Sequence, residues 1–436
     1  MRVGWGATLC AAQLAGAAAA QDSVSRRRAK PEAVGMSAAR LARVRTVLQG
    51  HVDAGRIPGA VAAVARRGEI VFFDAFGWAD VAAQRPMTTD AIFRVASMTK
   101  AFTAVAAMML HEEQGFPLRT PVSRWLPEFA ESQVAVRLAP EPGADEPRVA
   151  LVAATRPPSV LDLLRHTAGL GYQGPPNAAG KPAYRAVGVE AREQDLQQMV
   201  ARLARAPLYE QPGTRWRYGY SIDVLGRAIE VMTEESLDAF LFERLFAPLG
   251  LRDTGFFVPE AKHARLTTLY TPATEEGLAP AAAPLVPYEG LAQDGVRTRP
   301  RLLYGGAGAV STAGDYLRFA QMLLNGGELG GVRVLSRNAV ELMSRDHLGD
   351  RPRHGSLLAP GDGFGLSFRV TLDPARNGQP GSVGAFGWGG ATGTRFWIDP
   401  SAELVTVFMV QILPHKGLEY GHQFRSLVYK AIVDGE

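Results

Sequence analysis

The sequence predicts an α+β fold, in which an antiparallel sheet built from both ends of the chain is flanked by helices. Runs rich in β-forming residues lie at 59–65 and 70–76 and again in the last hundred residues, whereas helical patterns fill the middle. The first two runs are apolar almost throughout, which is typical of strands covered on both faces. We therefore expect a sheet domain formed by 21–130 and 301–436, with a mainly helical domain of residues 131–300 inserted into it.

The early elements follow from local signals. Ser37 is expected to cap a helix whose apolar side chains recur at helical spacing up to Val52. The two apolar runs that follow form a hairpin around residues 66–69, and a third segment becomes helical after Ser97 and ends at Gly115. Residues 131–158 read as an insertion with one strand at 148–153.

The later elements are predicted in the same way. Ser159 caps a short helix, and Thr312 with Asp315 resembles a capping box at the start of another. The segments 171–190 and 258–300 are expected to line the pocket, and a loop as long as 258–300 is usually functional. Further helices are expected at 160–165, 191–205, 219–232, 236–246, 316–324 and 423–433, and further strands at 365–370, 386–388, 394–398 and 404–412.

Composition excludes several classes of function. The chain has 436 residues, of which 47% are hydrophobic and 21% charged, as in a soluble globular protein. Its net charge of +4 comes without a basic block longer than residues 26–28, so no nucleic acid is expected as a partner. The eight histidines are scattered, and we expect neither a metal nor another cofactor. No membrane span is expected after the first twenty residues, and the oligomeric state is not predicted.

Residues 1–20 are expected to be a signal peptide, so the mature protein would be periplasmic or secreted. Arg2 precedes a mostly apolar stretch, and three alanines at 18–20 provide small residues for cleavage. The alternative is a disordered alanine-rich tail. Cys10, the one cysteine in the chain, lies in this segment, so the mature chain would have no disulfide and no cysteine nucleophile.

The helix after Ser97 contains a lysine in an unusual place. Residues 101–110 carry no charge, and a helix that is apolar on all sides belongs in a core. Lys100 lies in its first turn, on the same face as Ser97. Desolvation favours the neutral amine, which can act as the base for a serine nucleophile. The alternative is that Ser97 caps the helix while Lys100 extends to water.

Two other stretches carry chemical groups. Tyr218 precedes a helix and can relay a proton, unless it is a tyrosine half-buried at a domain junction. Ser221 lies in half of a nucleophile elbow that lacks the final glycine and the preceding strand, which argues against it as the nucleophile. The glycine-rich residues 387–393 predict an edge strand whose amides can stabilise an oxyanion, or alternatively a β-bulge.

Together these stretches resemble the serine β-lactamase-like hydrolases, the superfamily of class C β-lactamases, DD-peptidases and family VIII carboxylesterases. Residues 97–100 match the Ser-x-x-Lys motif, 218–220 are similar to Tyr-x-Asn, and Trp-Gly-Gly at 388–390 stands where β-lactamases carry Lys-Thr-Gly. Residues 164–170 are similar to the stretch around His-Thr-Ser-Gly-Leu. The resemblance covers residues 30–432 and implies a β-lactamase/transpeptidase-like fold.

The resemblance also implies an acyl-transfer mechanism. Ser97 would attack a carbonyl while Lys100, neutral or sharing a proton with Tyr218, takes the serine proton. Tyr218 would then protonate the leaving group and help to activate the deacylating water. The backbone amides of Ser97 and Ala391 would form the oxyanion hole, and His166 would hold the domain junction.

The motifs that differ from the family pattern indicate which class of substrate is bound. Trp-Gly-Gly lacks the charge and hydroxyl that bind a carboxylate, and a tryptophan wall suits a neutral ester. We therefore expect a serine hydrolase, most simply a carboxylesterase on small to medium esters. A β-lactamase or D-amino-acid peptidase acting on an amide is an alternative, since Arg395 is expected to be able to bind a carboxylate. A penicillin-binding-type sensor without turnover is another. The substrate-binding residues would be Tyr172, Tyr220, Trp388, Gly389 and Gly390.

Overall fold

A computed structural model gives the structure of the protein. It describes residues 28–139, 148–172, 181–191, 193–273, 284–288, 295–415 and 419–434. Cys10 and the expected signal peptide lie outside the described residues. None of the helices in the described ranges is long and apolar enough to cross a membrane.

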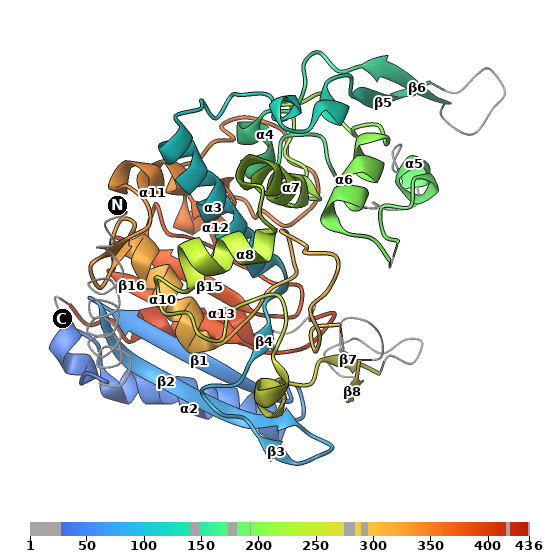
Figure 1. Cartoon of the computed structure of the whole chain (residues 1–436). Coiled ribbons are helices and arrows are strands. Elements are labelled where there is room, and N and C mark those ends of the chain that lie inside the picture. The colour runs from blue at the N-terminus through green and yellow to red at the C-terminus, as the bar shows by residue number, and fades with distance from the viewer. Residues whose placement is uncertain are drawn as a thin grey trace, which may run out of the picture.

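An eight-stranded sheet joins the two ends of the chain (Figure 1). Its strand order is β12-β13-β14-β15-β16-β1-β2-β3, and all neighbours run antiparallel. The strands are β12 (Asp362–Phe364), β13 (Arg369–Thr371), β14 (Phe386–Gly389), β15 (Arg395–Asp399), β16 (Leu404–Met409), β1 (Gly59–Arg66), β2 (Glu69–Asp80) and β3 (Arg85–Pro86). Because β1 pairs with β16 along its length, the antiparallel sheet predicted from both termini is confirmed.

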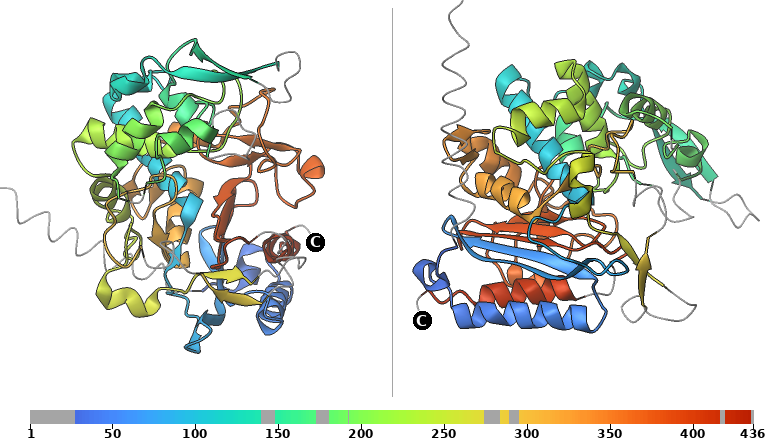
Figure 2. Two further views of the ribbon diagram at one scale, coloured as in Figure 1. Left: turned by 90° about the vertical axis from the view of Figure 1, so that its right-hand side faces the viewer. Right: turned by 60° about the horizontal axis from the view of Figure 1, so that its bottom comes forward.

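Both faces of the sheet are covered, as the apolar runs predicted. Helices α2 (Ala38–Asp53) and α13 (Tyr420–Lys430) pack side by side on one face (Figure 2). Helix α10 (Ala313–Leu324) covers the other face. Every residue of β1 is buried, since successive side chains of a strand point to opposite faces and both faces are packed.

Helix α3 and the helices of the middle segment stand above the sheet in Figure 1. They are α3 (Thr99–Gln114), α4 (Val160–Leu164), α5 (Lys181–Ala186), α6 (Leu196–Ala204), α7 (Ser221–Thr233) and α8 (Leu237–Leu241), which continues into a π-helical turn, Phe242–Phe246. Strand β6 (Arg148–Ala153) was predicted, but its partner β5 (Gln133–Leu138) was not. The domain boundaries stay predictions.

Short elements complete the chain. Strand β4 (Phe93–Arg94) pairs with β9 (Val310–Ser311), which holds the segment before Ser97 against the chain that follows Gly308. The other elements are β7 (Tyr270–Pro272), β8 (Leu285–Pro287), β10 (Glu328–Leu329), β11 (Val332–Arg333), α11 (Arg337–Ser344), α12 (Pro374–Asn377) and 3₁₀ turns at Pro31–Val34, Val122–Arg124, Pro127–Phe129 and Glu260–Arg265.

Two local predictions were wrong. Residues 365–370 do not form one strand, because the amide of Gly365 bonds to the carbonyl of Phe368 in a turn between β12 and β13. The run is apolar because Leu366 and Phe368 are buried in the core. The capping box of α10 is only half formed: Thr312 accepts the amide of Asp315, whose own carboxylate turns to other partners.

Candidate active site

Ser97 lies on a strained turn between β4 and α3. A 3₁₀ turn, Ala96–Met98, precedes the helix, and Ala96 has a left-handed φ of 45°. Such a conformation is costly for a residue with a Cβ and is concentrated at functional sites. Ser97 does not cap α3, whose N-cap is Met98 without a side-chain hydrogen bond, so the capping alternative was wrong.

Lys100 is buried beneath Ser97, with 1% of its surface exposed. Its Nζ donates to the carbonyl of Gly306 at 2.6 Å and to the Tyr172 hydroxyl at 3.1 Å. It also donates to Ser97 Oγ at 3.4 Å. The alternative in which Lys100 extends to water was therefore wrong, and the amine stands next to the nucleophile.

Two opposing influences act on the charge of Lys100. Burial lowers the pKa of its amine, but Tyr172, Tyr218 and Asp223 oppose burial, and the net effect raises the pKa above the ordinary value for lysine. Desolvation alone was expected to leave the amine neutral. The oxygen atoms around the side chain oppose that expectation, because they favour the ammonium form.

Tyr218 lies beside Lys100 and is hydrogen-bonded to Trp388, which comes from a distant part of the chain. Trp388 Nε1 donates to the Tyr218 hydroxyl at 3.0 Å. Lys100 Nζ lies 4.7 Å from the centroid of the Tyr218 ring, and the Tyr172 ring meets that ring edge-on at 5.6 Å. Three motifs that are far apart in the sequence therefore meet around one serine.

Tyr220 contributes its ring rather than its hydroxyl. Its hydroxyl donates to Glu190 at 2.9 Å, and its ring packs edge-on against Tyr172 at 4.7 Å. The structure thus places Tyr220 behind Tyr172. Gly219, between Tyr218 and Tyr220, lies so close to Gly171 that a Cβ would stand 2.5 Å from the Gly171 Cα.

His166 and Ser221 are both fully buried. The His166 ring is fully buried, 4.8 Å from the ring of Tyr218, and burial holds its pKa well below the ordinary value. Neither of its ring nitrogens has a hydrogen-bond partner in the part of the chain that is described. Ser221 is also fully buried, at the start of α7, where no substrate can reach its hydroxyl.

The turn between β14 and β15 is clamped against the residues before Ser97. Thr392 and Thr394 donate from their hydroxyls to the carbonyls of Arg94, at 2.9 Å, and Val95, at 3.3 Å. A Cβ on Gly390 would stand 2.5 Å from the Val95 oxygen, so only glycine permits this approach. The clamp brings Ala391 towards Ser97.

The amides assigned to the oxyanion hole are not used elsewhere. Within the described ranges, the backbone N–H group of Ala391 has no hydrogen-bond acceptor, and Ser97 lies in the first turn of a 3₁₀ helix, where N–H groups have no partner within the helix. Ala391 is exposed, and Ser97 is partly exposed. Both donors are therefore available to a ligand, as stabilisation of an oxyanion requires.

Arg395 lies on the wrong face of the sheet to bind a substrate. Its neighbour Phe396 packs in the same core cluster as α10, whereas Trp397 packs with α13 on the opposite face. Arg395 shares the face of Trp397, because side chains alternate along a strand, and a Cβ on Gly421 of α13 would collide with its guanidinium. The expectation that Arg395 binds a carboxylate was wrong.

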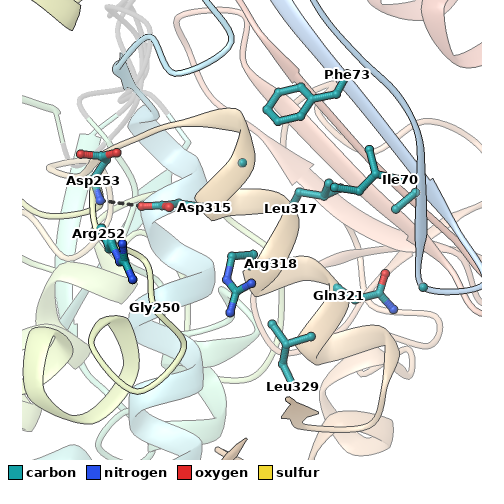
Figure 3. A pocket seen from close by; sticks show the side chains of 13 residues that line it. Ile70, Phe73, Gly250, Arg252, Asp253, Asp315, Leu317, Arg318, Gln321 and Leu329 are labelled. Atoms are coloured by element: carbon teal, nitrogen blue, oxygen red, sulfur yellow. Dashed lines mark hydrogen bonds between the residues drawn. The ribbon is translucent and has the colours of Figure 1, made fainter. Parts of the chain in front are cut away.

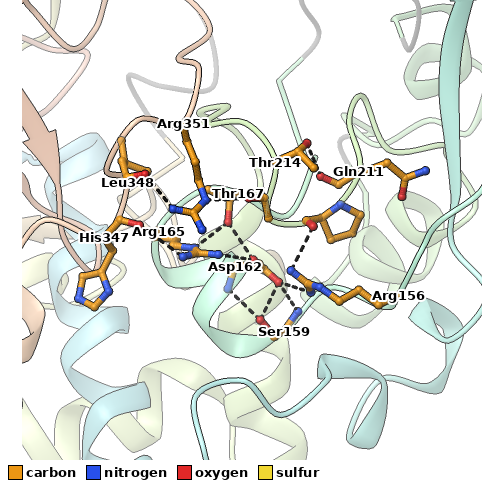
Figure 4. A network of polar contacts seen from close by, with 12 residues as sticks. Arg156, Ser159, Asp162, Arg165, Thr167, Gln211, Thr214, His347, Leu348 and Arg351 are labelled. Carbon is orange, nitrogen blue, oxygen red and sulfur yellow. Dashed lines mark hydrogen bonds and ion pairs between the residues drawn. The ribbon is translucent and has the colours of Figure 1, made fainter.

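A buried polar network supports the segments that carry His166 and Tyr218 (Figure 4). The carboxylate of Asp162 accepts from Arg156 at 2.6 Å, Arg165 at 3.0 Å, the Ser159 hydroxyl at 2.6 Å and Thr167 at 2.9 Å. Burial opposes ionisation of Asp162, but these donors outweigh it and lower its pKa to about 2. The arginines and hydroxyls therefore compensate the negative charge of Asp162.

The sequence analysis missed Asp223 and the glycine turn that it holds. Asp223 is almost fully buried in α7, and its Oδ1 accepts from the amide of Gly306 at 3.0 Å. The available signal was the acidic residue itself, placed in a helix turn that is otherwise apolar.

A separate hollow lies between the β1–β2 hairpin and α10 (Figure 3). Apolar side chains of Ile70, Phe73, Leu317 and Leu329 line it, together with Asp315. It contains neither Ser97 nor the residues around it. Among the described residues, no group of three His, Cys, Asp or Glu side chains is placed to hold a metal ion.

Comparison with known proteins supports the architecture. A family model described as Beta-lactamase matches residues 44–429. Protein Rv1367c of Mycobacterium tuberculosis is 38% identical over 83% of this chain and 88% of its own length. Esterase EstB of Burkholderia gladioli is 34% identical over 87% of this chain and 92% of its own. The structure of EstCE1, a hydrolase with promiscuous acyltransferase activity, superposes with a TM-score of 0.74 at 29% identity, covering 89% of this chain and 98% of that one.

Proposed function

We propose that this protein, which belongs to the Beta-lactamase family, is a serine carboxylesterase acting on small to medium esters through an acyl-enzyme. One observation carries the proposal: the buried Lys100 amine contacts Ser97 Oγ, and the Tyr218 hydroxyl beside it is hydrogen-bonded to Trp388, an uncharged side chain. The similarity to Esterase EstB supports an ester as the substrate.

Acylation begins with Ser97. Its Oγ attacks the ester carbonyl carbon, and the serine proton passes to the Lys100–Tyr218 pair once that pair has lost a proton to solvent. The amides of Ser97 and Ala391 bind the oxyanion. Collapse of the tetrahedral intermediate breaks the bond to the alcohol oxygen, and Tyr218 supplies the proton that the leaving alcohol needs.

In deacylation, water is the nucleophile and Ser97 is the leaving group. A water molecule loses a proton to Tyr218 or Lys100 and attacks the acyl carbon, and Ser97 Oγ leaves with a proton from the same pair. The hydrogen bond from Trp388 to the Tyr218 oxygen stabilises that oxygen when it holds negative charge.

The walls of the site favour neutral groups. The rings of Tyr172 and Tyr218 border Lys100, and the indole of Trp388 packs against the Tyr218 ring, so the groups around the Lys100 amine are aromatic. Arg395, the one cation that the sequence suggested as a carboxylate anchor, lies on the other face of the sheet. Penicillins and D-alanyl peptides, which carry a carboxylate, are therefore expected to be poor substrates.

The proposed location is the periplasm or the exterior of the cell. The sequence of residues 1–20 supports this proposal, with Arg2, an apolar stretch and small residues before Gln21. Intact-mass measurement of exported protein tests it, because cleavage would leave Gln21 as the first residue, and exported material that retains residues 1–20 would contradict it.

A panel of substrates tests the activity. We expect steady-state turnover of p-nitrophenyl acetate and butyrate, with little hydrolysis of nitrocefin or of a D-alanyl dipeptide. A stoichiometric burst without a steady state would instead support the sensor that does not turn over. Faster hydrolysis of nitrocefin than of every ester would support the β-lactamase alternative.

A further inference from the structure

Asp223 is a buried titratable group that the mechanism does not use. This carboxyl group is almost fully buried in the first turn of α7, where desolvation makes an acid costly. Burial raises the pKa of Asp223, while Lys100 and the Gly306 amide oppose that rise. Because burial of an acid costs free energy, the position of Asp223 next to the catalytic lysine indicates that it has a role in the site.

Asp223 reaches Lys100 through one residue. Its Oδ1 accepts from the amide of Gly306 at 3.0 Å, and the carbonyl of Gly306 accepts from Lys100 Nζ at 2.6 Å. The second contact is the shortest of the three hydrogen bonds that hold the amine. Thr103, one turn further along α3, donates to the Gly305 carbonyl at 2.8 Å and fixes the other side of the turn.

Gly306 is required by this arrangement. A Cβ at Gly306 would stand 2.7 Å from Asp223 Oδ2, so any side chain there would push the carboxylate away. The φ of Gly306 is not left-handed, so alanine at this position would meet only the steric conflict. The position of the Asp223 carboxylate therefore requires glycine at residue 306.

We propose that Asp223 is a positioning residue, which fixes the glycine turn so that the Gly306 carbonyl holds the Lys100 amine against Ser97. The inference rests on the proposed function, since it concerns the base of that reaction. The negative charge of Asp223 also favours the ammonium form of Lys100, and so sets the pH at which the base becomes available.

Other titratable groups face the pair and stay unchanged in the tests below. They are Tyr172 and His166 from the segment after α4, Tyr218 and Tyr220 from the segment before α7, Tyr304 from the segment before the glycine turn, and Glu190, which binds the Tyr220 hydroxyl. Among these groups, Asp223 is the carboxylate whose charge raises the pKa of Lys100.

A double-mutant cycle tests the positioning role. Asp223→Ala and Gly306→Ala are each expected to lower kcat for p-nitrophenyl butyrate, by between about tenfold and about a hundredfold, with little change in KM, because the base is displaced. In the Asp223→Ala background the new methyl group meets no carboxylate, so Gly306→Ala should then cost little. Effects that multiply in the double variant, or single variants with the kcat of the wild type, would overturn the inference.

The pH profile tests the role of the charge and does not depend on whether Asp223→Ala folds. Asp223→Asn keeps the size of the side chain and removes the charge, which lowers the pKa of Lys100. The rise of kcat/KM with pH should therefore move to lower pH. Asp315→Asn is the matched control, because Asp315 is a buried carboxylate that also accepts a backbone amide, from Asp253 at 2.7 Å, away from Ser97. An unshifted profile in Asp223→Asn would contradict the role of the charge.

Labelling of Ser97 by a fluorophosphonate separates the two proposals. Wild-type protein that is neither labelled nor able to hydrolyse esters would overturn the proposed function itself. Wild-type protein that reacts, together with Asp223 and Gly306 variants that react at the same rate and with the same pH dependence, would overturn only the positioning role.

Discussion

The carboxylate of Asp162 and the amine of Lys100 are both buried, but their surroundings differ. Asp162 is surrounded by two arginines and two hydroxyls, which lower its pKa to about 2. Lys100 has no acidic side chain within ion-pair distance in the described part of the chain, and is held by a carbonyl, a tyrosine hydroxyl and Ser97.

The difference follows from what each charge must do. A structural ion is stable when opposite charges and hydrogen bonds replace its lost hydration, and nothing is gained if it titrates. A base must release and accept a proton in the accessible pH range, so it is surrounded by polar groups that tolerate both forms. Removing each charge should therefore damage different properties.

The largest effect is expected at the catalytic pair. Ser97→Ala and Lys100→Ala should each lower kcat/KM for p-nitrophenyl esters by about a thousandfold or more, since each removes a participant in acyl transfer. Lys430→Ala is the matched control, because Lys430 is an exposed lysine at the end of α13. Turnover at the wild-type rate in either site variant would rule out the mechanism.

Asp162→Ala should lower stability more than it lowers activity per folded molecule. It leaves Arg165 buried without its carboxylate, which costs about 3–5 kcal/mol of unfolding free energy. Urea denaturation measures this. The control is Glu341→Ala, which breaks an exposed pair with Arg345 and should cost less than about 1 kcal/mol. Equal losses in the two variants would contradict the comparison.

The two charges also predict opposite responses to pH. Asp162 has a lowered pKa, so its contribution of about 2 kcal/mol is present above about pH 4 and is lost as the pH falls towards about 2. The melting temperature of Asp162→Asn should lack that part of the acid dependence.

Lys100 has a raised pKa, so kcat/KM should rise with pH as the ammonium form is lost. A rate that falls steadily with rising pH would contradict this charge state.

The smallest effect is expected at Trp388. Trp388→Phe keeps an aromatic wall but removes the donor to the Tyr218 hydroxyl, a loss of about 1 kcal/mol or about fivefold in kcat. The control is Trp78→Phe on β2, where the indole is 38% exposed. If both variants kept the wild-type kcat, the Trp388–Tyr218 hydrogen bond would have no part in turnover.

Much of the fold was predictable because its signals are local. The caps at Ser37 and Ser159, the β1–β2 hairpin and the apolar character of α3 depend on nearby residues. The strand predicted at 365–370 failed because an apolar run shows that a segment is buried, not that it is extended. Strand β5 was not predicted because no local pattern marks it. It is defined by its pairing with β6 and by a bridge to Leu208, which is distant in the sequence.

The sequence by itself determined the chemical groups: Ser97 and Lys100 one helical turn apart, Tyr218 before a helix, and Trp388 with two glycines. Only the tertiary structure decided what those groups experience. It turned Arg395 away from the site, closed the Thr392–Thr394 clamp on the chain before Ser97, and placed Asp223 behind Gly306. The charge of Lys100 shows the reason, since a pKa depends on every atom near the group, and the atoms near Lys100 come from four separate parts of the chain.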